Sequence, residues 1–214
     1  MTAAVQFARA GLAILSVDLR GIGETRITPD LNDSEFYRYF GDYEDGMTAI
    51  MMNRTLAGMR ALDIVRGLDM LAARPDVGAD KFRAIGRNSA AMPVLYASLF
   101  DTRIEAVSLE KMLVSYQAVA SAPMHRLIFE QIVPGALLDF DLPDLVSALA
   151  PRTVWISDPM TPTNTAVPHA EFVETYAAAV KAFSIAGQSG KLRLQHARPD
   201  DEYSAEYYRE LLSS

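Results

Sequence analysis

The chain of 214 residues contains no cysteine, which excludes disulfide bridges, thiolate metal clusters and a cysteine nucleophile. It also lacks any apolar run near the roughly 18 residues that a membrane-spanning helix needs. The first residues show no basic stretch followed by a long apolar one, so no signal peptide is recognisable. This absence favours the cytoplasm, but a secreted chain also begins after its signal has been removed. The compartment therefore stays open between these two.

Positive charge is scarce, because 20 Lys and Arg stand against 27 Asp and Glu for a formal charge of −7. Such a surface repels phosphate backbones and anionic lipid headgroups. We therefore expect neither nucleic acid nor a membrane as a partner. Only three histidines are present and no H-E-x-x-H pair occurs, so no metal site is predicted.

Two glycine-containing stretches do not match nucleotide-binding loops. The turn D-L-R-G-I-G-E-T at residues 18–25 would need a third glycine where Arg26 stands. The stretch G-Q-S-G-K at residues 187–191 lacks the first glycine and the hydroxyl residue of a phosphate loop. We therefore predict no cofactor.

The hydrophobic content of 50% suffices for one domain with a substantial core, over residues 1–214. Short β-prone runs predict strands at residues 12–17, 82–85, 104–109, 153–157 and 192–196. Helical patterns cover residues 3–10, 56–71, 89–100, 170–183 and 205–212, whereas residues 26–45 have the composition of a long loop. This alternation predicts an α/β fold with a mostly parallel sheet and helices on both faces.

In open α/β sheets the working residues lie beyond the carboxyl ends of the strands. The segment G-R-N-S-A-A at residues 86–91 follows one expected strand and precedes an apolar helix. Small residues there permit the tight strand-to-helix turn that exposes a nucleophile and directs helix amides at an oxyanion. Ser89 supplies the hydroxyl of this segment, next to the amide of Ala90. As an alternative, Ser89 caps the helix.

Two further side chains follow expected strands. Asp158 comes directly after residues 153–157, and His196 ends the last strand. The chain order Ser89, Asp158, His196 is that of nucleophile, acid and base in α/β hydrolases. The alternatives are a turn residue for Asp158 and a solvated loop histidine for His196. The other two histidines, His125 and His169, have no such placement and are interpreted as structural or surface residues.

Several motifs resemble one family. The turn at residues 18–25 matches the D-x-R-G-x-G-x-[ST] turn of many α/β hydrolases. The stretches A-R-P-D-V-G-A-D-K-F-R-A-I-G (73–86), D-T-R-I-E-A-V (101–107), F-D-L-P-D-L (140–145) and A-P-R (150–152) resemble the acetylxylan esterase and dienelactone-hydrolase-like group. The resemblance covers nearly the whole chain. It implies a metal-independent serine esterase whose partners are small esters or acylated carbohydrate.

The chain departs from that family at the nucleophile. The family pattern G-x-S-x-G places its serine two residues after Gly86, where this chain has Asn88. An amide cannot act as that nucleophile, and Ser89 stands one position late, which rotates a side chain by about 100° on a helical turn. Ser89 can serve only if the turn is reshaped. The acid of the family also aligns a few residues beyond Asp158, near Thr161.

Two functions therefore remain open. The first is a carboxylic ester hydrolase of the acetylxylan-esterase type, with an activity that is weakened or lost. In it Ser89 attacks the ester, His196 removes its proton, Asp158 orients His196 and the Ala90 amide holds the oxyanion. The second is a non-catalytic relative that binds carbohydrate or serves as a structural module of a larger protein.

The resemblance also implies an N-terminally incomplete fold that comprises two-thirds or more of the family domain. In the family a third strand and an oxyanion loop precede the D-x-R-G turn, but only 12 residues precede Ala13. The third strand lies between the strands that correspond to residues 12–17 and 82–85. Either residues 13–17 pair directly with residues 82–85, or another segment or a partner chain fills the gap, or the natural protein is longer. We favour the last.

Overall fold

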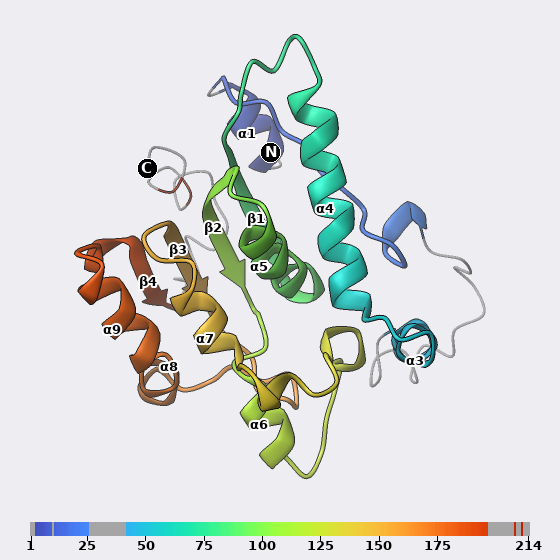
Figure 1. Cartoon of the computed structure of the whole chain (residues 1–214), viewed down its shortest axis with the longest axis vertical. Coiled ribbons are helices and arrows are strands. Elements are labelled where there is room, and N and C mark those ends of the chain that lie inside the picture. The colour runs from blue at the N-terminus through green and yellow to red at the C-terminus, as the bar shows by residue number, and fades with distance from the viewer. Residues whose placement is uncertain (1–2, 10, 26–41, 197–207, 209–210, 212–214) are drawn as a thin grey trace.

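The computed structural model describes residues 3–9, 11–25, 42–196, 208 and 211 (Figure 1). The strands are β1 (Phe82–Arg87), β2 (Ile104–Glu110), β3 (Thr153–Ser157) and β4 (Leu192–Gln195). The α-helices are α1 (Ala3–Arg9), α3 (Tyr43–Met51), α4 (Leu56–Ala72), α5 (Ala91–Phe100), α6 (Tyr116–Ser121), α7 (Leu142–Ser147), α8 (His169–Thr175) and α9 (Ala177–Ile185). Short 3₁₀ turns are η1 (Gly23–Thr25), η2 (Asn88–Ala90), η3 (Phe129–Gln131), η4 (Ala136–Leu138) and η5 (Ser189–Lys191).

The sheet has the order β1-β2-β3-β4, and every neighbouring pair is parallel. The predicted parallel sheet is therefore confirmed. At its carboxyl edge Arg87 stands opposite Glu110, Glu110 opposite Ser157 and Ser157 opposite Gln195. The segments that follow the four strands therefore all begin at the carboxyl edge of the sheet.

Both faces of the sheet are covered. The larger core joins β-strand residues such as Leu109 and Ile156 to α5 and α9, where Leu95 and Phe183 are fully buried. A smaller cluster contains Phe7, Ala106, Trp155, Tyr208 and Leu211. Because neighbouring residues of one strand point to opposite faces, these clusters lie on opposite sides of the sheet. The prediction of helices on both faces is confirmed.

Several predicted boundaries need correction. The helix expected over residues 89–100 begins at Ala91, because residues 88–90 form a 3₁₀ turn. The helix expected over residues 170–183 is divided into α8 and α9 at Tyr176. The expected loop at residues 26–45 ends early, since α3 begins at Tyr43, and residues 26–41 lie outside the described part. Of residues 205–212 only 208 and 211 are described, and both are helical.

Residues 12–17 do not form the expected strand. The segment 11–19 has no regular secondary structure, and no backbone hydrogen bond joins it to β1. The side chain of Leu15 lies against Gly67 of α4, where an added Cβ would be 3.2 Å from Leu15 Cδ2. The segment therefore packs on the helix instead of joining the sheet, and the direct pairing considered for residues 13–17 and 82–85 is wrong.

A cavity of about 570 Å³ lies between this segment and β1. Its wall is mainly apolar and includes Leu12, Leu15 and Val17 on one side and Phe82 and Ala84 on the other. Lys81 and Arg83 are its charged lining residues. In the described part of the chain β1 is thus an edge strand that borders a groove.

Candidate active site

The turn at residues 18–25 owes its shape to its own side chains. The Asp18 carboxylate accepts a hydrogen bond from the amide of Glu24 at 3.0 Å, and the Thr25 hydroxyl donates to the Leu19 carbonyl at 2.7 Å. Gly21 and Gly23 have φ values of 77° and 55°, which side-chain-bearing residues rarely adopt. The two glycines are therefore needed for the backbone conformation of the turn.

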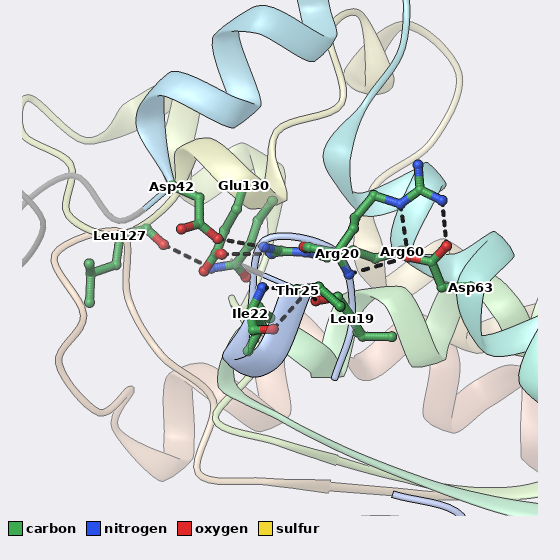
Figure 2. A network of polar contacts seen from close by, with 10 residues as sticks. Leu19, Arg20, Ile22, Thr25, Asp42, Arg60, Asp63, Leu127 and Glu130 are labelled. Carbon is green, nitrogen blue, oxygen red and sulfur yellow. Dashed lines mark hydrogen bonds and ion pairs between the residues drawn. The ribbon is translucent and has the colours of Figure 1, made fainter. Parts of the chain in front are cut away.

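A buried arginine fixes the same turn to three elements. Arg60 of α4 is fully buried. Its Nε donates to the Arg20 carbonyl at 3.0 Å, its Nη1 to Oε2 of Glu130 at 2.7 Å and its Nη2 to Oδ2 of Asp42 at 2.5 Å (Figure 2). The Arg20 side chain in turn pairs with Asp63, with its Nε 2.8 Å from Oδ2. Sequence reasoning missed this network because its partners lie far apart in the chain.

Two carboxylates share the one Arg60 guanidinium. Burial, assisted by the neighbouring Asp42 and opposed by Arg60, raises the pKa of Glu130 to about 7. A buried carboxyl beside a like charge holds its proton more tightly than in water. Glu130 consequently titrates near neutrality.

The bend after β1 is a tight strand-to-helix turn, as predicted. At its apex Asn88 has a φ of 52°, in the left-handed region. A Cβ on Gly86 would lie 2.6 Å from the Ala90 carbonyl oxygen and 2.8 Å from the Ala91 Cα, so only glycine fits there. Strained, closely packed backbone of this kind is typical of a nucleophile elbow. The residue that the elbow presents at its apex is Asn88.

Ser89 follows the apex within η2. The residue that caps α5 is Ala90, and no side-chain capping bond is formed there, so the interpretation of Ser89 as a helix cap is wrong. Within the described ranges the side chains of Ser89 and Asn88 make no hydrogen bond, to His196 or to any other group. The roles of Ser89 and of the Ala90 amide stay predictions.

The structure brings Asp158 and His196 together. The His196 Nδ1 lies 3.0 Å from the Asp158 Oδ1, within hydrogen-bond distance. The Asp158 amide also donates to the Gln195 carbonyl at 3.1 Å, which holds the two loops side by side. Thr161 instead bonds the Thr165 hydroxyl, at 2.7 Å, and makes no bond to His196. Asp158 is thus the acidic partner of the last histidine.

His169 lies at the surface, as predicted, and its ring faces that of His196. The centroid of its ring lies 5.5 Å from that of His196, and the ring of Phe172 lies 6.2 Å from His196. What the sequence did not predict is that His169 also borders the candidate site. The signal that could have found it is the spacing of His169 and Phe172, which places both on one face of a helix that follows the Asp158 loop.

Sequence reasoning also missed Glu110, which ends β2 and is fully buried. Its Oε1 accepts hydrogen bonds from the Ser108 hydroxyl at 2.9 Å and the Tyr208 hydroxyl at 2.6 Å. Burial is the main cause that raises the pKa of this carboxyl. Its position at a strand end was the available signal. The Tyr208 bond ties the chain beyond His196 back to the sheet.

The candidate site therefore occupies the carboxyl edge of the sheet. The elbow follows β1, Asp158 follows β3 and His196 follows β4, and these strands are parallel. Among the described residues no group of three or more His, Asp or Glu side chains is placed to hold a metal ion. In the same part of the chain, no helix combines the length and apolar character required to span a membrane.

No family model and no curated protein sequence matches the chain. Among solved structures, a Bacteroides fragilis protein provisionally described as an acetyl xylan esterase superposes with a TM-score of 0.72 at 18% identity, over 94% of this chain and 50% of its own. A glucuronoyl esterase from Caldicellulosiruptor kristjansonii gives a TM-score of 0.54 at 17% identity, over 87% of this chain and 55% of its own. Over the superposed parts the chain therefore shares the fold of these solved structures.

A third solved structure agrees with this fold. The glucuronoyl esterase from Solibacter usitatus gives a TM-score of 0.53 at 15% identity, over 73% of this chain and 48% of its own. At such identities the likeness concerns the fold alone. The chain spans about half the length of these esterases.

Proposed function

We propose that the chain is a carboxylic ester hydrolase of the acetylxylan-esterase type. The observation that carries the proposal is the 3.0 Å contact between Asp158 Oδ1 and His196 Nδ1. A carboxylate on Nδ1 orients the imidazole and leaves its Nε2 to act as a general base. The esterase names of the solved structures with this fold give further support.

The proposed reaction uses Ser89 as the nucleophile. Its Oγ attacks the ester carbonyl carbon while its proton passes to Nε2 of His196, and the Ala90 amide hydrogen-bonds the oxyanion. The alkoxide then leaves with that proton, and an acyl group remains on Ser89. A water molecule attacks this acyl-enzyme in the same manner and releases the acid. The proposed substrates are small acyl groups on carbohydrate.

A pair of adjacent variants tests this function through the hydrolysis of p-nitrophenyl acetate. We expect turnover to be lost in Ser89→Ala and kept in Asn88→Ala, because only the first removes the attacking hydroxyl. Asn88→Ala is the matched control for any disturbance of the turn. Absence of turnover in the unaltered protein, or equal turnover in both variants, would reject Ser89 as the nucleophile.

A second function is favoured by Asn88. An amide at the apex of the elbow supports a non-catalytic relative that binds carbohydrate or acts as a structural module of a larger protein. Calorimetric titration with acetylated xylo-oligosaccharides separates the two functions. Binding without release of acetate would support the second, whereas acetate release would support the hydrolase.

We also propose that an N-terminal segment or a partner chain supplies one more strand beside β1. The support is the apolar groove of about 570 Å³ between that strand and residues 11–19. An open strand edge presents backbone donors and acceptors that another extended segment can pair. A strand in this groove would bury apolar side chains and extend the sheet.

A further inference from the structure

His196 is surrounded by two rings of α8 as well as by Asp158. The ring of His169 meets that of His196 at 5.5 Å between centroids and an angle of 62°, and the ring of Phe172 meets it at 6.2 Å and 69°. These are the distances and edge-to-face angles of favourable aromatic pairs. Residues three apart on a helix share one face, so α8 presents both rings to His196.

The backbone around α8 fixes where these rings lie. The Val167 amide donates to the Pro159 carbonyl at 2.9 Å. This bond closes the loop that follows Asp158 and brings the start of α8 back beside Asp158. Deeper in the helix Phe172 is fully buried, and its ring lies 5.3 Å from that of Tyr176. The Tyr176 hydroxyl donates to the Val114 carbonyl at 3.1 Å. His169 is therefore the outermost ring of an anchored aromatic face.

The Asp158 contact alone does not fix the imidazole of His196. One hydrogen bond holds a single ring atom, and the His196 side chain is 32% exposed, so the ring can still swing toward solvent. The rings of Phe172 and His169 occupy the space beside it. Phe172 belongs to the core, whereas His169 is exposed, so the latter can be truncated with little effect on the fold.

We propose that His169 is a positioning residue that keeps the His196 imidazole in the orientation bonded to Asp158. His169 acts through the contact of its ring with the ring of His196. It takes up no proton in the proposed reaction. The consequence for catalysis rests on the proposed ester hydrolysis. The geometry of the two rings can be tested without any turnover.

Proton NMR in water gives the direct test, because the chain has only three histidines. His125 is exposed and bonds the Val119 carbonyl through Nε2, so His125→Ala removes one imidazole away from the site. In this background we expect a downfield resonance from the His196 Nδ1 proton, assigned by its loss in Asp158→Ala. It should persist in His169→Phe, which keeps a ring, and vanish by solvent exchange in His169→Ala.

The proposal is overturned if His169→Ala keeps the resonance with an unchanged exchange rate, or if the His125→Ala protein lacks it. Matching urea midpoints of His169→Ala and His169→Phe would show that the loss is not due to unfolding. On p-nitrophenyl acetate we expect kcat of His169→Ala to fall roughly 10- to 100-fold at constant KM, with recovery in His169→Phe. Absence of turnover in all variants would reject the hydrolase, while the resonance still decides the role of His169.

Discussion

Asn88 preserves the shape of the elbow while it changes the chemistry at the apex. Its φ of 52° lies where most side chains are strained, but asparagine enters this region more readily than most residues. Gly86 keeps the close approach of β1 to the start of α5 that the bend requires. Asn88 thus fits the backbone at the apex, where it offers an amide and no hydroxyl.

We therefore predict that Asn88→Ser raises p-nitrophenyl acetate turnover by about 10²-fold, since it would place a hydroxyl at the apex of the bend, at the same sheet edge as His196. Steady-state kinetics measures the gain. The matched control is Asn53→Ser, because Asn53 is exposed, has a similar φ of 56° and lies between α3 and α4, outside the proposed site. An equal gain in the control variant, or no gain in Asn88→Ser, would contradict the claim that the rest of the site is arranged to activate a serine at position 88.

Asp158 and His196 could be predicted because each directly follows an apolar strand, and strand ends collect working residues in this kind of fold. His169 could not, because its place depends on how the excursion after Asp158 returns to the site. Glu110 was available at a strand end, but its sequence neighbours give no sign of the bond from Tyr208. Residue spacing along the sequence does not reveal such contacts between residues that are far apart in the chain.

At the scale of elements, apolar periodicity predicts the four strands and α4, whose N-cap Thr55 accepts from the Gly58 amide at 3.1 Å. Residues 12–17 have the same β-prone character but no strand, because a strand needs a partner and this segment packs on α4. The long helix expected before β4 is interrupted at Tyr176. There the demands of packing outweigh local helix propensity.

The clamp that Arg60 makes between α4, η3 and the residue before α3 predicts a pH-dependent stability. The folded-state pKa of Glu130 is raised to about 7 from an unfolded value near 4.5, so the folded protein binds this proton more tightly. The contribution of Glu130 to the free energy of unfolding should then be highest below pH 4.5 and fall by on the order of 2 kcal/mol as the pH rises through 7.

Urea unfolding at pH 5, 6, 7 and 8 measures this slope. In Glu130→Gln we expect the part due to Glu130 to disappear, because the amide cannot ionise but still accepts from Arg60. Glu174→Gln on the exposed side of α8 is the control and should leave the slope unchanged. A slope that persists undiminished in Glu130→Gln would refute this account of the clamp.

At the scale of the whole molecule, β1 has no strand paired to its outer edge among the residues that the structure describes. The chain spans about half the length of the solved esterases that share its fold. The groove beside β1 is bordered by partly exposed apolar side chains, including Ile14 and Ile85. An apolar groove at an unpaired strand edge is suited to receive another extended segment.

We predict that the groove binds the dye anilinonaphthalene sulfonate and enhances its fluorescence, as exposed apolar surface does. Ile14→Asp should reduce the enhancement severalfold, because it places a charge in the groove. Leu138→Asp is the control, since Leu138 is 88% exposed and does not line the groove. Fluorescence that is unaffected by Ile14→Asp would mean that the groove is closed in solution.

The most direct test of the central claim is the site of covalent labelling by a fluorophosphonate, read by peptide mass mapping. A serine activated by the pair of His196 and Asp158 attacks this reagent as it would attack an ester. We predict one adduct, located on Ser89, that is lost in His196→Ala. An unlabelled chain, or an adduct that persists in His196→Ala, would contradict the claim that this edge of the sheet is an esterase site.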